Sequence, residues 1–117
     1  MVRLTLALLA LAILCACDDG PPPDMTDPGQ LLFMGYVKKD VNCSRCHGVD
    51  GKGGEKAPSL DGVFAKLGED GVLDIIEEGK KGKEDDMPPF EGMITDDELT
   101  NLLAFLKTLQ SQPAPGN

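Results

Sequence analysis

Five consecutive residues in the first half of the chain combine two thiols and an imidazole at a spacing that can hold a cofactor. Cys43 and Cys46 are separated by two residues and His47 follows directly, so the segment has the pattern C-x-x-C-H. At this spacing two thiols can form thioether bonds to the two vinyl groups of a haem, and the histidine can bind the iron as its proximal ligand. The motif predicts one covalent haem c, attached through Cys43 and Cys46.

Other uses of a C-x-x-C spacing suit this chain less well. A structural zinc ion normally takes four protein ligands, and apart from Cys15 and Cys17 the sequence offers only the motif's own two cysteines and its single histidine. A zinc site would therefore need a carboxylate or a partner chain. A thioredoxin-like redox pair normally lies in a βαβ unit, but the sequence has no strand-like alternation. A structural disulfide within the motif would leave His47 without a function.

The composition limits the classes of function that are open to the chain. Its 117 residues are enough for one small domain, and its net charge is −9. This acidic balance argues against nucleic-acid binding and against a broad electrostatic attachment to anionic lipids. With four phenylalanines, one tyrosine and no tryptophan, the chain has little aromatic surface for a core of its own. A buried haem would supply the missing apolar mass.

The N-terminal 28 residues have the features of an export signal followed by a spacer. Arg3 precedes an apolar run over residues 4–14, which is short for a bilayer span and typical of a signal peptide. The run ends in Leu14-Cys15-Ala16-Cys17, which resembles a bacterial lipobox, so we expect a signal peptide over residues 1–16 and lipidation of Cys17. Ordinary signal cleavage nearby, leaving a soluble periplasmic protein, is the alternative. The proline- and aspartate-rich residues 17–28 predict an extended linker.

The haem domain is expected over residues 29–110, with a flexible tail over residues 111–117. Apolar residues at helical spacing predict a first helix over residues 29–39, and its apolar face is expected to hold Leu32, Phe33 and either Tyr36 or Val37.

Two further helices are predicted, and no internal repeat is found. The apolar residues of positions 69–78, followed by Gly79, predict a second helix. Thr95 and Glu98 form a capping box ahead of a leucine stripe, which predicts a C-terminal helix. Residues 80–90, between these two helices, are interrupted by Gly82, Pro88 and Pro89 and are not expected to be regular.

Together these patterns resemble a small bacterial class I cytochrome c, over roughly residues 29–109. Gly29 and Phe33 resemble the glycine and aromatic pair of the family's N-terminal helix, and Leu102 and Phe105 resemble the pair on its C-terminal helix. The resemblance implies an all-α cytochrome c fold, with three to five short helices around one covalently bound haem. It implies one-electron transfer rather than enzymatic catalysis.

The same resemblance assigns the remaining residues of the haem site. Pro58 resembles the proline whose carbonyl accepts a hydrogen bond from the ligand imidazole, and Leu60 resembles the leucine that lines the haem pocket. Met87, in the sequence Met-Pro-Pro-Phe, resembles the distal iron ligand. Met93 is the rival, but it lies just before the C-terminal cap and could be a core residue. With His47 and Met87 as axial ligands, both axial positions of the iron are filled.

The expected function is therefore that of an exported, lipid-anchored, monomeric electron carrier between membrane or periplasmic redox partners. An alternative is the electron-accepting cytochrome subunit of a periplasmic dehydrogenase or oxidase complex. A haem-based ligand sensor or peroxidase is a third hypothesis, which requires Met87 to be absent or labile as a ligand. Three lysines form a basic cluster just upstream of Met87, and they either form a solvated surface or orient a redox partner. These are Lys80, Lys81 and Lys83.

Overall fold

The computed structural model describes residues 20–83 and 85–111, and this part of the chain is helical. The helices are α1 (Pro28–Phe33), α2 (Ser44–His47), α3 (Val63–Glu78) and α4 (Asp96–Thr108). The described residues contain no β-strand, only one isolated antiparallel bridge between Lys80 and Met87. The expected all-α architecture of three to five short helices is therefore confirmed. The expected signal peptide over residues 1–16, the lipidation site Cys17 and all but the first residue of the tail lie outside the described residues.

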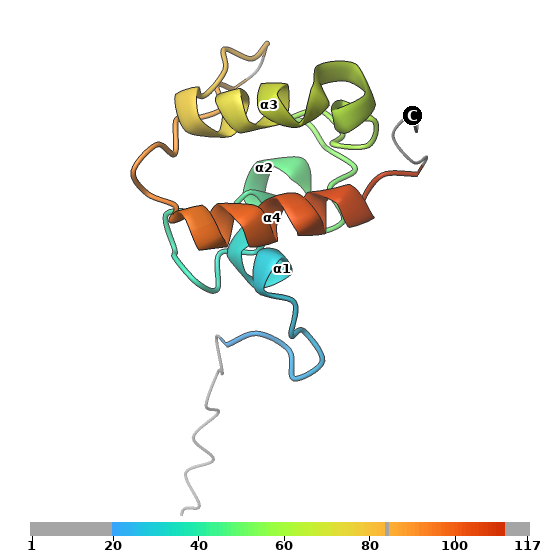
Figure 1. Cartoon of the computed structure of the whole chain (residues 1–117). Helices are drawn as coiled ribbons and strands as arrows, with labels where there is room; N and C mark the ends of the chain where they lie inside the picture. Colours follow the sequence, from blue (N-terminus) through green and yellow to red (C-terminus); the bar gives the residue numbers. More distant parts are fainter. Residues whose placement is uncertain (1–19, 84, 112–117) are drawn as a thin grey trace, which may run out of the picture.

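The helices are arranged in a small stack. Figure 1 shows α3 and α4 lying roughly antiparallel to one another in two layers, with α2 behind the space between them. Helix α1 lies on the other side of α4, and the linker leads away from it. Two long irregular segments complete the domain. We call residues 48–62, which join α2 to α3, the proximal loop, and residues 79–95, which join α3 to α4, the distal segment.

Helix α1 is half as long as the sequence predicted. Asp27 caps its N-terminus by accepting a hydrogen bond from the Gln30 amide at 3.0 Å. At the other end Gly35, with a φ of 82°, takes the left-handed conformation that terminates helices. The chain then turns away, so Tyr36 and Val37 are exposed and do not extend the apolar face as expected.

The crossing of α1 over α4 is the closest packing between helices. A Cβ added at Gly29 would lie 2.8 Å from the Cβ of Phe105 and would also collide with the backbone of Asn101. Glycine is therefore required where the two backbones approach. The rings of Phe33 and Phe105 lie 5.3 Å apart at an interplanar angle of 60°, a favourable tilted arrangement. Leu102 is fully buried at the same crossing.

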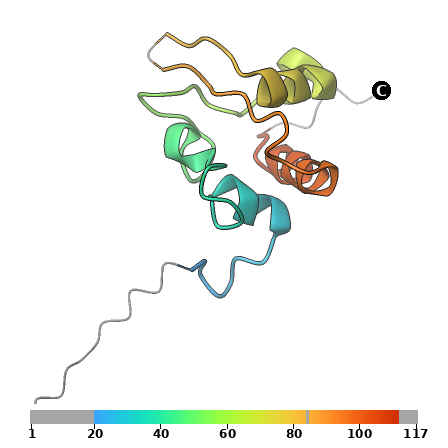
Figure 2. The same ribbon diagram turned by 90° about the vertical axis from the view of Figure 1, so that its left-hand side faces the viewer.

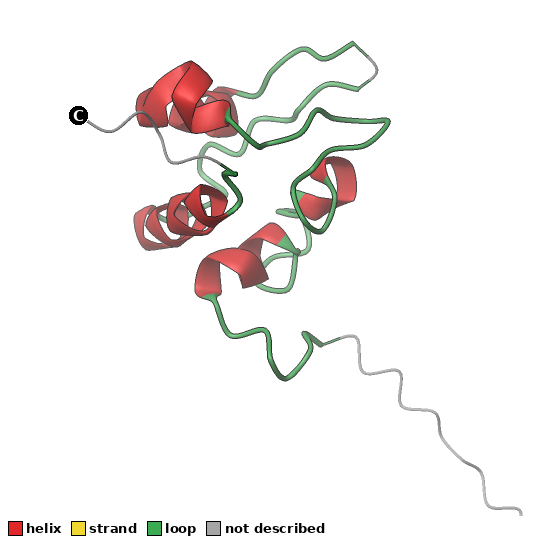
Figure 3. Ribbon diagram, turned by 90° about the vertical axis from the view of Figure 1, so that its right-hand side faces the viewer, coloured by secondary structure: helices red, strands yellow, loops and turns green. Residues whose placement is uncertain are grey.

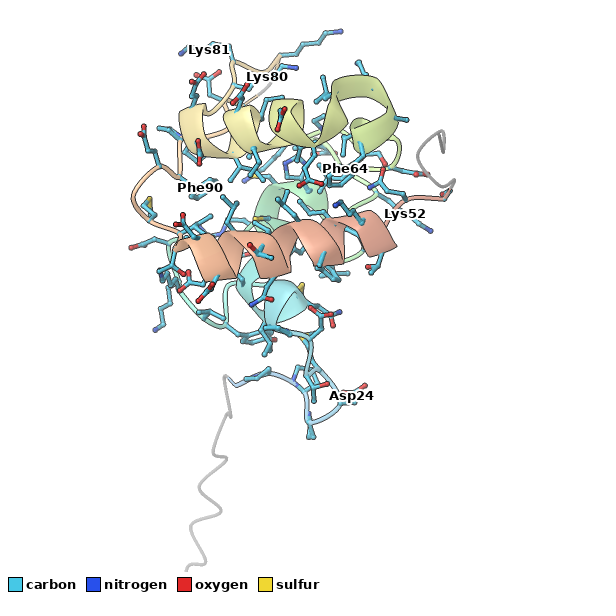
Figure 4. The ribbon with its side chains drawn as sticks, viewed as in Figure 1. Asp24, Lys52, Phe64, Lys80, Lys81 and Phe90 are labelled. Atoms are coloured by element: carbon cyan, nitrogen blue, oxygen red, sulfur yellow. The ribbon has the colours of Figure 1, made fainter. Side chains whose placement is uncertain are left out.

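Helix α3 begins six residues earlier than predicted, at Val63, and bends at Gly68, where φ is 71° and ψ is 170°. The predicted second helix corresponds to the part after this bend. The extra first turn carries Phe64, which is buried. Figure 4 shows Phe64 and Phe90 between α3 and α4, near opposite ends of the two helices.

The predicted capping box starts α4. The Thr95 hydroxyl accepts a hydrogen bond from the Glu98 amide at 3.2 Å, and the Glu98 carboxylate accepts one from the Thr95 amide at 3.4 Å. Lys38 adds a tertiary contact, because its ammonium pairs with Glu98 at 2.9 Å and donates to the Met93 carbonyl at 2.8 Å. The end of the distal segment is thereby joined to the chain that follows α1.

Candidate haem-binding site

The C-x-x-C-H motif forms the four-residue helix α2 and the residue before it. The amides of Cys46 and His47 both donate to the Cys43 carbonyl, at 3.3 and 3.0 Å. This single helical turn contains all three functional side chains of the motif. Asn42 supports the turn, because its side-chain oxygen accepts hydrogen bonds from the Ser44 hydroxyl at 2.7 Å and from the Arg45 amide at 3.2 Å.

The two thiols of the motif are free and partly buried. Burial is the main reason that the pKa of Cys43 is raised to about 11, and the neighbouring Cys46 raises it further. The Cys43 thiol is therefore protonated at neutral pH in this fold. No disulfide joins the two thiols, and no cluster of three metal-ligating side chains is found in the described ranges.

His47 is buried, with a hydrogen bond at one ring nitrogen only. Its Nδ1 lies 3.0 Å from the carbonyl oxygen of Pro58. A carbonyl can only accept, so Nδ1 carries a proton and donates it, and in the neutral imidazole the lone pair is then on Nε2. This is the protonation state in which a histidine binds a metal through Nε2, and the carbonyl fixes the orientation of the ring.

Leu60 lies on the same loop as Pro58, two residues further on. Its amide donates to the Gly51 carbonyl at 2.7 Å, and its half-buried side chain packs against the core. A Cβ added at Gly51 would lie 2.7 Å from Leu109 Cδ1 and 3.7 Å from Leu60 Cδ1, so both leucines approach this point of the proximal loop. The loop therefore carries an apolar side chain two residues after the carbonyl that is hydrogen-bonded to His47.

Met87 is held in a short hairpin of the distal segment. Its amide donates to the Lys80 carbonyl at 2.8 Å, and its carbonyl accepts from the Lys80 amide at 3.0 Å. The Phe90 amide then donates to the Ile76 carbonyl at 3.0 Å, which ties the chain after the two prolines to α3. The backbone of Met87 is thus fixed on both sides while its side chain remains outside any helix.

The structure distinguishes Met87 from the other methionines. The side chain of Met87 is partly buried against the core, whereas that of Met93 is 38% exposed and lies outside the core cluster. Met34, the C-cap residue of α1, packs against the core. Met25 lies in the linker that precedes α1.

The structural elements of the predicted site face the same side of the molecule. In Figure 3, α2, the proximal loop and the hairpin of the distal segment all project to the right, away from α3 and α4. Figure 2 shows the same three elements together from the opposite side. Cys43, Leu60 and Met87 also pack against one common core cluster.

The lysine cluster lies at the outer end of this hairpin. Figure 4 shows Lys80 and Lys81 beyond α3, on the side away from α4. Lys81 pairs with Asp86 at 2.7 Å, and the side chain of the lysine is 91% exposed. The pair raises the pKa of Lys81 and lowers that of Asp86. One of the three positive charges is therefore already matched by a local carboxylate.

Comparison with known proteins identifies the family of the chain. The cytochrome c family model matches residues 27–110, which is most of the chain. The chain belongs to the cytochrome c family. It is 31% identical over 90 residues to the cbb3-type cytochrome c oxidase subunit CcoP of Helicobacter pylori. That match covers 75% of this chain but 29% of CcoP, so the chain spans less than a third of this curated relative.

Solved cytochrome structures share the fold. The c-type cytochrome XoxG of Methylobacterium extorquens AM1 is 25% identical, with a TM-score of 0.51 over 74% of this chain and 57% of XoxG. Cytochrome cL of the methylotroph Methylophaga aminisulfidivorans is also 25% identical, with a TM-score of 0.53 over 69% of this chain and 50% of its own.

Family membership establishes the cofactor class. Cytochromes c carry covalently bound haem c, and Cys43 and Cys46 occupy the attachment positions of the motif. The residues present suit this group, because the thiols are free and the buried imidazole has an available Nε2. Residues 27–110 are accordingly a haem-binding domain of the family of electron-transfer cytochromes c. Within the described ranges no helix is long and apolar enough to span a membrane.

Two residues that contact the site were missed in the sequence. Asn42 accepts hydrogen bonds at the start of α2, one residue before the N-cap Cys43. An asparagine directly ahead of the motif is the signal that could have identified it, since asparagine is common near helix N-termini. Gln110 hydrogen-bonds the proximal loop from the end of α4. Nothing in the sequence indicates this contact, because the two segments are fifty residues apart.

Proposed function

We propose that this cytochrome c is a single-electron carrier whose iron is bound by His47 and Met87. Cys43 and Cys46 attach the haem, the Pro58 carbonyl orients the proximal imidazole, and Leu60 contributes to the apolar pocket. The haem supplies a one-electron iron couple. The chain's own residues attach it, fix its ligands and exclude water from it.

The hydrogen bond between His47 and Pro58 carries this proposal. It connects the motif to a loop eleven residues away at 3.0 Å and leaves Nε2 as the only free ring nitrogen. A histidine that binds a metal through one ring nitrogen usually donates the N–H of the other ring nitrogen to a carbonyl or carboxylate.

Met87 is favoured as the second axial ligand by its position in the distal segment. Its half-buried side chain and its fixed backbone suit a ligand better than the exposed side chain of Met93 does. A methionine opposite a histidine raises the reduction potential and leaves no open coordination position. Ligation by Met87 therefore favours electron transfer over a ligand sensor or a peroxidase.

We further propose that the chain acts outside the cytoplasm as a monomeric domain. In this proposal residues 1–16 are removed, Cys17 carries the lipid anchor and residues 17–28 form the linker. The haem domain of residues 29–110 would then stay close to membrane-bound or periplasmic redox partners, with residues 111–117 as a tail. Tethering raises the local concentration of the domain at those partners.

The similarity to CcoP supports a second candidate. CcoP is by its description a subunit of an oxidase, and the haem domain could likewise serve as the electron-accepting subunit of a dehydrogenase or oxidase complex. Purification from membranes of the native host separates the two hypotheses. A catalytic chain that copurifies in a fixed ratio would favour the subunit, and a haem protein recovered alone would favour the carrier.

Substitution of the two candidate methionines tests the axial ligation. Met87→Leu should abolish the weak long-wavelength absorption band that reports sulfur ligation of ferric haem, and it should lower the reduction potential. Met93→Leu is the matched control and should keep both. Loss of the band in Met93→Leu with retention in Met87→Leu would refute the assignment.

A further inference from the structure

The side chain of Gln110 makes three hydrogen bonds at the end of α4. Its Nε2 donates to the carbonyls of Leu60 at 3.0 Å and Leu106 at 2.9 Å, and its Oε1 accepts from the Gly62 amide at 2.7 Å. The amide orientation is unambiguous, because two partners can only accept and the third can only donate. The Gln110 side chain thereby links the end of α4 to Leu60 and Gly62, the two chain neighbours of Asp61 in the proximal loop.

Ser111, the residue after Gln110, is also hydrogen-bonded to the proximal loop. The Asp61 carboxylate accepts hydrogen bonds from the backbone amide of Ser111 at 2.7 Å and from its hydroxyl at 2.5 Å. Residues 60–62 of the proximal loop are therefore held by two consecutive residues that follow the C-cap of α4. Figure 1 shows this end of α4 on the same side of the molecule as the start of α3, which the loop leads into.

These contacts lie next to the residue that orients the histidine. Pro58, whose carbonyl accepts from His47, is only two residues from Leu60. The loop on the other side of Pro58 is held by a hydrogen bond from the Gly54 amide to the Ala57 carbonyl at 3.0 Å. The Pro58 carbonyl is thus fixed from both directions, and Gln110 provides the connection to a regular helix.

We propose that Gln110 is a positioning residue for the proximal side of the haem. By holding residues 60–62, it keeps the Pro58 carbonyl in register with the Nδ1–H of His47 and limits opening of that hydrogen bond. The inference rests on the proposed role of His47 but not on Met87 or on any redox partner. Gln110 acts through the loop and touches neither the haem nor its ligands.

A purely structural role makes a different prediction. If Gln110 served only to complete the C-terminus of α4, its loss would destabilise the domain as a whole, and every protected proton would exchange faster in proportion. A positioning role predicts a selective effect at the imidazole. Exchange of the His47 Nδ1 proton, relative to that of core amides in α4, separates the two.

The experiment measures this exchange by NMR in the haem-loaded, reduced protein. Gln110→Met keeps the length of the side chain and removes all three hydrogen bonds. We expect the Nδ1 proton of His47 to exchange about tenfold faster. The net loss of one hydrogen bond raises the population of the locally open state of the loop by about that factor. Thr108→Val is the matched control, because its hydroxyl donates only to the Phe105 carbonyl of the same helix.

Gln110→Glu serves as a second variant if the methionine variant does not fold. It keeps an acceptor for the Gly62 amide but places a carboxylate against the Leu60 and Leu106 carbonyls, so it should also speed exchange at His47. Unchanged exchange at His47, or an acceleration equal to that of the core amides, would overturn the proposal. A wild-type protein without a haem-shifted Nδ1 proton for His47 would instead refute the proposed proximal ligand.

Discussion

Gly79 lies directly against the backbone of Met87. A Cβ at position 79 would stand 2.5 Å from the Met87 carbonyl oxygen and 2.9 Å from the Pro89 nitrogen. Gly79 also ends α3, where its amide donates to the Ile75 carbonyl at 2.8 Å and its φ is 76°. The residue that stops the helix therefore also allows the hairpin to bring Met87 back against the end of α3.

Gly79→Ala is expected to displace the Met87 hairpin. The variant must place a methyl group against backbone atoms that cannot move as a side chain could, a cost of about 1–3 kcal/mol beyond that of the positive φ itself. Gly92→Ala is the control, because Gly92 has the same φ of 76° but open space around its Cβ. Chemical denaturation of both haem-loaded variants measures the difference, and equal stability losses would contradict this account.

Acid should release the contact between Asp61 and Ser111. The Ser111 hydroxyl and amide hold the pKa of Asp61 below its ordinary value of 3.8, so the contact stabilises the folded state above that pH. The stabilisation is lost as the pH falls through the lowered pKa of the folded state. The coupling between Asp61→Asn and Ser111→Ala in a double-mutant cycle should therefore be favourable at neutral pH and vanish in strong acid. A coupling that does not change with pH would contradict this prediction.

The lysine cluster is expected to contribute little to partner recognition. Lys81 is paired with Asp86, and acidic residues follow Lys83 directly in the sequence. Lys81→Ala and Lys83→Ala should therefore leave both the rate of electron transfer and its salt dependence close to those of the parent protein. Stopped-flow measurement over a range of ionic strength checks this. A steep salt dependence that disappears in either variant would show that the cluster does orient a partner.

Membrane attachment should depend on Cys17. If the lipobox interpretation is correct, Cys17→Ala removes the acylation site and releases the haem protein into the soluble periplasmic fraction. Cys15→Ala is the control and should stay with the membrane. Fractionation followed by detection of covalent haem measures the distribution, and a Cys17→Ala protein that still sediments with membranes would refute lipid anchoring at this residue.

Local signals predicted part of the helical framework, and tertiary packing decided the rest. The capping box of Thr95 and Glu98 depends only on neighbouring residues, so α4 was predicted at its correct start. The length of α1 was not, because Gly35 ends the helix and apolar spacing alone continues through Val37. The early start of α3 escaped detection because a bend at Gly68 interrupts the helical pattern.

The sequence by itself determined the chemistry of this cytochrome c: two thiols and an adjacent imidazole, identifiable from residue types at short spacing, and a candidate methionine, indicated by the family resemblance. Only the tertiary structure decided what surrounds them. The contact of Gly79 with Met87 and the hydrogen bonds of Gln110 to the proximal loop join separate segments, and the latter residue lies fifty positions from Leu60. Such contacts depend on how helices pack, and a local pattern carries no record of that packing.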